Sequence, residues 1–276
     1  MLRWMLRIIV GVVVAAGVVA AFGYHEARRL PIVRHATIRM PDWPNGARPV
    51  TVALLADIHM ASPAMDATRL RRIIAEVNGL HPDVITIAGD FIQGRGRAET
   101  ARALPILARE LDHLRAPLGI VAVLGNHDQW TDPRAVAAML NRAGITFLAN
   151  DAVERGPLAI GGAGDSFTGH ADIKRTVAAL RRLPGVKILV AHSPNVVHHL
   201  PPDVHLLLAG HTHCGQVVLP LFGPPVDVAD PRYRCGMIRD PGRLTIVTAG
   251  LGTSDLPIRI GAPPDIWLVR IEGSAG

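Results

Sequence analysis

Apolar segments with the length of buried strands alternate with amphipathic helix patterns through the first half of this 276-residue chain. The strand-like runs are residues 50–56, 83–88, 119–124 and 145–148, and the helical patterns between them are residues 66–79, 100–114 and 133–143. Parallel strands need a long crossover connection, which is usually a helix. This order therefore predicts βαβ units and an α/β fold.

The second half continues the pattern with less regularity. Further strands are expected at residues 158–162, 187–190, 204–209, 244–248 and 266–271, with a helix at 172–182 and Pro- and Gly-rich loops over 219–242. No composition typical of a linker appears after residue 50, so we expect one domain over residues 50–276. Residues 24–49 are expected to be a juxtamembrane linker, with one strand at 36–40.

Polar residues follow five of the strand-like runs, at the point where each run ends. They are Asp57, His59, Asp90, Asn126, His127, His192, His211 and His213. A single histidine or Gly-Asp pair after a strand is more often a turn residue than a ligand. In open α/β sheets, however, binding sites form at the carboxyl ends of the strands, where these loops can meet. The repetition therefore predicts one shared site.

The stretch Gly210-His211-Thr212-His213 follows one of these strands and contributes two imidazoles. On extended backbone, alternate side chains face the same way, so both histidines are expected to point into the site.

The residue types at these strand ends are typical ligands of transition metals. Imidazole and carboxylate groups without thiolate suit manganese, iron(II) or zinc, and they suit calcium poorly. Two such ions about 3.5–4 Å apart polarise a phosphoryl group and lower the pKa of a shared water. Asp90 is expected to bridge the two ions by giving one oxygen to each. The ligand types therefore favour phosphoester hydrolysis.

The motifs Asp57-x-His59, Gly89-Asp90, Gly125-Asn126-His127-Asp128, His192 and Gly210-His211-x-His213 occur in this order in the chain. Together they resemble the five motifs of the calcineurin-like metallophosphoesterase superfamily, over residues 50–271. The resemblance implies a four-layer α-β-β-α sandwich with a dinuclear metal site at the strand carboxyl ends.

The same resemblance implies a role for each of these residues. One metal is expected on Asp57, His59, Asp90 and His213, and the other on Asp90, Asn126, His192 and His211. His127 would stabilise the transition state or protonate the leaving oxygen. Both ions are expected to be manganese, with iron or zinc as alternatives.

Two residues depart from the superfamily pattern. Many of its phosphatases carry an aspartate three residues after the bridging one, which orients the catalytic histidine, whereas this chain has Gln93. Cys214 stands where glycine is common, and a free thiol so near the site would make activity sensitive to oxidation or soft metals. Cys214 and Cys235 are the only cysteines, and the sequence leaves open whether they pair.

An uncharged apolar segment over residues 8–22 lies near the start of the chain. With the residues before it, the segment approaches the ~20 residues that span a bilayer, so residues 1–23 are expected to form a transmembrane anchor. A cleaved secretory signal is the alternative. Arginines lie on both sides of the segment, so the positive-inside rule leaves the orientation open.

The segments Gly250-Leu251-Gly252-Thr253-Ser254 and Pro257-Ile258-Arg259, with the residues around Cys214, are similar to a bacterial branch of membrane-associated or exported phosphoesterases. Some relatives of that branch hydrolyse the pyrophosphate of UDP-diacylglucosamine. The expected function is therefore hydrolysis of a phosphodiester or pyrophosphate, with a lipid-linked substrate favoured by the anchor. The expected location is the inner membrane of a bacterium.

Two other functions stay open at this point. A metal-binding scaffold that has lost catalysis would fit the absence of aspartate at Gln93. A nuclease would fit the net charge of +6. However, no dense basic run with interleaved aromatic residues is present, so nucleic acid is not the expected partner.

Outside the motifs, Asp165 is expected at a turn, Asn195 and Gln216 beside the ligands, and Arg259 at a substrate phosphate or in a surface salt bridge. The sequence does not decide the oligomeric state.

Overall fold

The computed structural model describes residues 1–274, in which two six-stranded sheets pack face to face between outer helices. The first sheet contains, in order across it, β1 (Ile32–Met40), β12 (Asp265–Gly273), β2 (Val50–Leu55), β3 (Val84–Ala88), β4 (Ile120–Val123) and β5 (Thr146–Phe147). The second contains β10 (Gly236–Asp240), β11 (Arg243–Val247), β9 (Leu206–Ala209), β8 (Val186–Ala191), β7 (Leu158–Gly162) and β6 (Asp151–Arg155).

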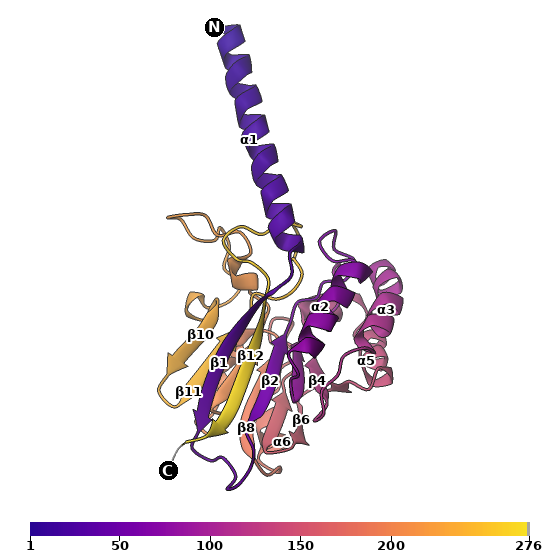
Figure 1. Cartoon of the computed structure of the whole chain (residues 1–276), viewed down its shortest axis with the longest axis vertical. Coiled ribbons are helices and arrows are strands. Elements are labelled where there is room, and N and C mark those ends of the chain that lie inside the picture. Colours follow the sequence, from indigo (N-terminus) through magenta and orange to yellow (C-terminus); the bar gives the residue numbers. More distant parts are fainter. Residues whose placement is uncertain (275–276) are drawn as a thin grey trace.

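Helices cover the outer face of each sheet and complete the expected four layers (Figure 1). The first sheet carries α2 (Ala67–Gly79), α3 (Arg97–Leu111) and α5 (Pro133–Arg142), and the second carries α6 (Ile173–Leu180). Short helical segments are α4 (Asn126–Thr131), η1 (Pro194–His199), η2 (His213–Gly215) and η3 (Pro231–Tyr233). The α/β sandwich implied by the motifs is confirmed.

The central core lies between the two sheets, because the inner residues of both sheets are apolar. Val52, Leu54 and Val121 of the first sheet pack with Ile160 and Ile188 of the second, and all five are 0% exposed. Strands buried on both faces give continuous apolar runs, which is why their positions can be predicted from sequence. The predicted elements within residues 50–271 fall within three residues of their structural bounds.

Two strands, β6 and β10, were not expected. Both are antiparallel edge strands, and their side chains are only partly buried. Their sequences, Asp-Ala-Val-Glu-Arg and Gly-Met-Ile-Arg-Asp, therefore lack the apolar runs of the central strands. Edge strands of this kind are commonly short and charged.

The segment expected to be a linker, residues 24–49, is largely part of ordered structure. Residues 24–28 complete α1 (Leu2–Arg28), and β1 pairs in parallel with β12 from Ile32 to Met40. The linker expectation is therefore corrected: β1 forms one edge of the first sheet. The reason is that β12, at the far end of the chain, offers a strand for β1 to pair with.

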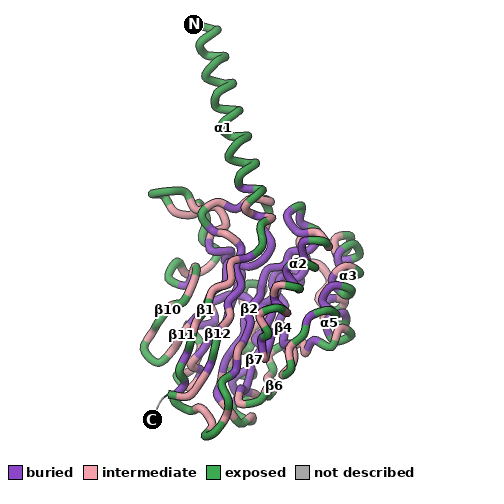
Figure 2. Tube along the Cα trace, viewed as in Figure 1, coloured by how far each residue is buried: buried purple, intermediate pink, exposed green. Residues whose placement is uncertain are grey.

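Helix α1 leaves the domain and stands apart from it (Figures 1 and 2). Residues 2–22 are exposed, whereas Gly23 and Ala27 are buried against the domain. The helix is long and apolar enough to cross a membrane. Trp4 and Tyr24 lie near its two ends, where amphipathic aromatic side chains favour the bilayer interface.

Candidate metal centre

All eight predicted site residues lie at one edge of the two sheets, on the loops and first helical residues that follow β2, β3, β4, β8 and β9. The eight are Asp57, His59, Asp90, Asn126, His127, His192, His211 and His213, and none is more than 7% exposed. Because the five strands end at the same edge, residues up to 156 positions apart in sequence become neighbours. The structure therefore brings the whole predicted set together.

One group of ligand atoms is formed by Asp57, His59 and His213. The Nε2 atoms of His59 and His213 lie 3.1 Å apart, and the two rings stack with centroids 5.0 Å apart. Oδ1 of Asp57 lies 3.8 Å from Nε2 of His213. Two imidazoles and a carboxylate therefore face one small volume.

A second group surrounds His192. Its Nε2 lies 3.0 Å from Oδ1 of Asn126 and 3.0 Å from Nδ1 of His211. Its Nδ1 is 2.8 Å from the carbonyl oxygen of Ala88, to which it donates a hydrogen bond. A backbone contact of this kind fixes the ring so that Nε2 points into the site.

Asp90 lies between the two groups. Its Oδ2 is 3.4 Å from Nε2 of His59 and 3.4 Å from Nε2 of His192. Its Oδ1 accepts a hydrogen bond of 2.9 Å from the backbone N–H of His127. Oδ2 therefore faces both groups while Oδ1 accepts from the backbone, and the expectation that each oxygen would serve one metal stays a prediction. Asp90 also forms a group with His59 and His127.

The ligand loops have strained backbone. Asp57, His59, Asp90, His211 and His213 have φ angles of 53°, 48°, 55°, 72° and 49°. A residue other than glycine in this left-handed region costs about 1–3 kcal/mol, and such residues cluster at functional sites. The expectation of extended backbone at 211–213 is therefore wrong. The turn instead sends His213 to the first group and His211 to the second.

Gly210 permits a close approach of the loops. A Cβ atom at this position would lie 2.6 Å from Oδ2 of Asp57, which no side chain can tolerate. The backbone N–H of the next residue, His211, lies 3.1 Å from the same oxygen. The glycine in the Gly-His-x-His motif thus allows the loop after β9 to contact the carboxylate after β2.

The protonation states of three buried imidazoles, those of His59, His211 and His213, suit metal binding. Burial lowers the pKa of His59 to about 3 and that of His211 to about 3, and it lowers the pKa of His213 well below its usual range. Burial also acts to lower the pKa of His192, but the charge of Asp90 outweighs it and raises the value to about 10. Nδ1 of His59 and Nε2 of His211 are buried without a hydrogen-bond partner among residues 1–274. Neutral imidazoles that face each other and buried carboxylates fit divalent cations.

His127 has an orienting partner that the sequence did not reveal. Its Nδ1 lies 3.0 Å from the carbonyl oxygen of Gly94. This carbonyl provides the contact expected from an aspartate at position 93. Asp128 does not replace it either, since its carboxylate accepts backbone hydrogen bonds from Phe91 and Gly125. The orienting role can thus be filled without a carboxylate.

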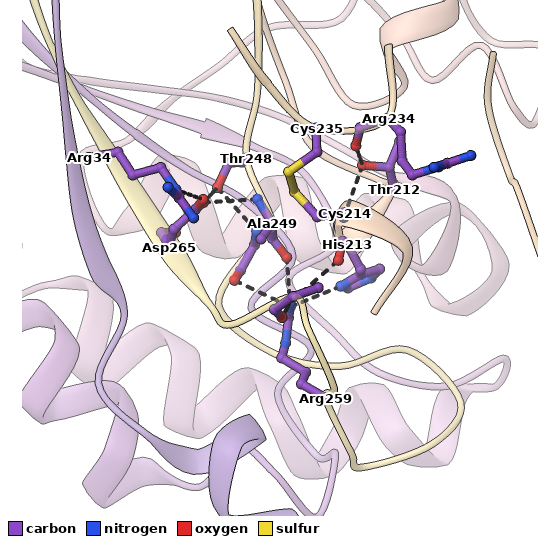
Figure 3. Close-up of a disulfide and its surroundings, with 12 residues drawn as sticks. Arg34, Thr212, His213, Cys214, Arg234, Cys235, Thr248, Ala249, Arg259 and Asp265 are labelled. Atoms are coloured by element: carbon purple, nitrogen blue, oxygen red, sulfur yellow. Dashed lines mark hydrogen bonds and ion pairs between the residues drawn. A yellow bond between two sulfur atoms is a disulfide. The ribbon is translucent and has the colours of Figure 1, made fainter. Parts of the chain in front are cut away.

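Arg259 is neither at the surface nor in contact with the pocket, which corrects both expectations for it. It is 0% exposed. Its Nη2 donates to the carbonyl oxygens of Ala249 and Gly252, each at 2.6 Å, and its Nη1 donates to Ala262 at 2.9 Å. Nη2 also lies 3.2 Å from Nδ1 of His213 (Figure 3). Arg259 therefore joins the 249–262 loop to a candidate ligand.

Cys214 and Cys235 form a disulfide (Figure 3). The expectation of a reactive free thiol beside the site is therefore wrong. The disulfide follows His213 directly, and Oγ1 of Thr212 donates to the carbonyl oxygen of Arg234 at 2.6 Å. These two links attach the ligand loop after β9 to the segment before β10.

A pocket of about 350 Å³ opens beside the ligands. Five of the predicted site residues line it: Asp90, Asn126, His127, His211 and His213. Its other walls include Arg95, Trp130, Phe167, Val226, Val228 and Leu256. The guanidinium of Arg95 lies 4.9 Å from the Trp130 ring centroid. These wall residues were not predicted from the sequence, because Trp130 lies in the short helix α4 and the others lie on loops with no periodic pattern. The pocket combines an exposed cation with aromatic and aliphatic side chains.

Three other residues with expected roles hold loops in place. Asp165 accepts hydrogen bonds at the turn before Thr168, as expected. Asn195 accepts one from the backbone of Asp230. Gln216 donates to the carbonyl oxygen of Leu256, and it lines the pocket.

Residues 50–215 match the sequence model of the calcineurin-like phosphoesterases. The chain belongs to this family. An uncharacterized metallophosphoesterase of Aquifex aeolicus is 29% identical, with 94% of this chain and 98% of that protein covered. One of Bacillus subtilis is 28% identical, with 99% and 98% covered. A transmembrane protein with a metallophosphoesterase domain from Danio rerio is also 28% identical, and the chain spans 61% of its length.

As a member of this family, the protein is a metal-dependent phosphoric ester hydrolase, and two divalent metal ions are its cofactors. Its candidate ligands are the buried groups around Asp90. The recognition of the family from five short motifs is confirmed.

Proposed function

We propose that the two groups around Asp90 hold the two metal ions of the enzyme. Asp57, His59, Asp90 and His213 would hold one, and Asp90, Asn126, His192 and His211 the other. The position of Oδ2 of Asp90, 3.4 Å from an imidazole nitrogen of each group, is the observation that supports this division. When bound, such ions polarise a phosphoryl group and activate water for attack on phosphorus.

His127 acts in this proposal on the leaving oxygen. Nδ1–H of His127 donates to the Gly94 carbonyl, so the imidazolium form carries its second proton on Nε2, from which it would protonate the departing oxygen or stabilise its charge. His127 also lines the pocket, where a substrate would lie. The scaffold hypothesis loses its main support, because the absent aspartate at Gln93 is replaced by a backbone carbonyl.

The proposed metal is manganese, with iron or zinc as alternatives. The ligand set offers imidazole, carboxylate and amide groups, and Cys214 is held in a disulfide and offers no thiolate. Ligand type narrows the choice to these three metals, and availability in the cell decides among them.

The proposed substrate is a phosphodiester or pyrophosphate carried by a membrane lipid. The observation that supports this class is the position of the pocket. Residues 254–256 form one wall of the pocket, and Arg259 follows them closely in the chain. The backbone N–H of Arg259 donates a hydrogen bond to Gly23 at the base of α1, so the pocket lies near the end of the domain where α1 begins. Aliphatic wall residues would contact the lipid part, and Arg95 would meet a phosphate.

A panel of substrates tests this proposal. The full-length protein in phosphatidylcholine vesicles would be assayed with CDP-diacylglycerol, bis-p-nitrophenyl phosphate and p-nitrophenyl phosphate, each with manganese, iron(II) or zinc. We expect kcat/KM for the lipid-linked pyrophosphate to exceed that for the monoester by about tenfold or more, since burying two methylenes contributes about 1.6 kcal/mol. Preference for the monoester would contradict the proposed class.

We further propose that α1 anchors the protein in the inner membrane of a bacterium, with the enzyme domain on the extracytoplasmic side. The Cys214–Cys235 disulfide supports this side, because disulfides persist in oxidising compartments and are rare in the cytoplasm.

The disulfide also gives the test of this orientation. Cells that express the full chain would be lysed with a maleimide-polymer reagent, with and without prior reduction. We expect at least about nine-tenths of the protein to be unmodified without reduction and doubly modified after it. On a gel, the singly modified Cys235→Ser variant marks the position of a protein with one free thiol. Full modification without reduction would place the domain on the cytoplasmic side.

A further inference from the structure

A hairpin beside the pocket displays apolar side chains to solvent. It runs from Leu219 to Gly223 and is closed by two backbone hydrogen bonds between these residues, at 3.0 and 2.9 Å. At its tip, Leu221 is 102% and Phe222 85% exposed. The closing hydrogen bonds hold both side chains away from the domain. Two large apolar groups held in this way are typical of a surface that contacts an apolar partner.

The hairpin lies close to the point where α1 leaves the domain. Its preceding residue, Val218, donates a backbone hydrogen bond to Ile260 at 2.8 Å. The neighbouring Arg259 donates to Gly23, at the base of α1, at 2.9 Å. In Figure 1 the orange loops of this region lie at the end of the domain from which α1 extends. The exposed tip and the anchor therefore share one end of the molecule.

The length of α1 fixes where a bilayer would begin. Residues 2–22 are exposed. At 1.5 Å per residue they extend over about 32 Å, close to the ~30 Å of the hydrocarbon core. The near surface of the bilayer would therefore lie at Gly23 and Tyr24, which is the end of the domain that carries the hairpin.

We propose that the Leu219–Gly223 hairpin inserts Leu221 and Phe222 into the bilayer that α1 crosses. The partner is the lipid bilayer itself, because the anchor brings this end of the domain to its surface. Val226, which is 65% exposed, continues the apolar surface from the hairpin to the pocket wall. The docked hairpin therefore sets the pocket mouth at the lipid headgroups, where a lipid-linked phosphoester enters without leaving the bilayer.

This inference rests on the proposed anchorage by α1 and does not depend on which lipid is hydrolysed. Its test uses the full chain in phosphatidylcholine vesicles with single fluorescent labels at Phe222→Cys, Val12→Cys or Asn45→Cys. The native cysteines are paired and do not react. Val12 lies in the middle of α1, and Asn45 is an exposed residue in the loop between β1 and β2 at the opposite end of the domain.

We expect spin-labelled phosphatidylcholine to quench the labels at positions 12 and 222 at least twofold more strongly than the label at position 45. Quenching at 12 but not at 222 would overturn the hairpin proposal and leave the anchor intact. Quenching at neither position would overturn the anchorage and the hairpin insertion together.

A second measurement uses activity. The double variant Leu221→Asp with Phe222→Asp should lose about tenfold in turnover of CDP-diacylglycerol in vesicles, while turnover of soluble bis-p-nitrophenyl phosphate stays within twofold of the wild type. Both side chains are exposed, so folding should be unaffected. Equal turnover of the vesicle substrate by variant and wild type would contradict the proposal. Absence of turnover on both substrates by the wild type would instead contradict the proposed function.

Discussion

Replacing Asp90 with alanine is expected to lower turnover of bis-p-nitrophenyl phosphate by about 10³-fold, because a bridging ligand supports several kcal/mol of transition-state stabilisation. Oδ2 of Asp90 faces both ligand groups at 3.4 Å, so its loss should weaken both metal sites. Burial opposes ionisation of Asp90, but the neighbouring His192 and His59 hold its pKa well below the usual range. The variant thus removes a carboxylate that faces both groups.

Metal content separates the role of Asp90 from that of His127. Measured by elemental analysis of the purified full-length protein, Asp90→Ala should retain at most about one metal equivalent of the two in the wild type. His127→Ala should retain both while losing about 10²-fold in kcat, as expected for a residue that acts on the leaving oxygen.

Asp112→Asn, at an exposed position, is the matched control for these variants and should change neither turnover nor metal content. Wild-type turnover of Asp90→Ala would refute the bridging role. Loss of metal in His127→Ala would make His127 a ligand, in agreement with its grouping with His59 and Asp90.

Replacing Arg259 with methionine is expected to destabilise the folded domain by at least about 3 kcal/mol. Methionine keeps most of the side-chain volume but leaves the carbonyl oxygens of Ala249, Gly252 and Ala262 without their donor, at about 1–3 kcal/mol for each buried group. Burial lowers the pKa of Arg259 to about 10, so the guanidinium is still charged at neutral pH and donates to all three.

Thermal unfolding of the full-length protein in detergent measures this effect. A loss of this size lowers the Tm of a domain of about 230 residues by about 10 °C. Arg239→Met, an exposed arginine in β10, should change the Tm by less than about 2 °C. A similar Tm for both variants would show that the buried network of Arg259 contributes little to stability.

The contact between Nη2 of Arg259 and Nδ1 of His213 also predicts weaker metal binding in Arg259→Met than in Arg239→Met.

Much of the site could be predicted from the sequence, because strand ends are visible in it. The apolar run 204–209 ends at Gly210, so His211 and His213 had to lie at the carboxyl end of a strand. Repetition after four other strands located the common edge. The expectation about their backbone failed, because a left-handed turn and an extended segment leave the same pattern of residues in sequence.

Other features depend on contacts between distant segments. Arg259 occurs in Pro-Ile-Arg-Ile, where nothing local indicates that it is buried under His213. The partner of His127 is the carbonyl of Gly94, and every residue has a backbone carbonyl. The residue type at position 94 therefore gives no sign that its carbonyl contacts His127.

The sequence by itself determined the buried strands and their order along the chain, the set of candidate ligands and the apolar segment of α1. These follow from local periodicity and from the residues at strand ends, which do not depend on how the sheets pack. Only the tertiary structure decided that Cys214 pairs with Cys235, that β1 joins the sheet through β12, and that the Leu219–Gly223 hairpin lies at the end of the domain from which α1 extends. Each of these depends on which distant segments are brought within contact distance, and packing of the two sheets sets those distances.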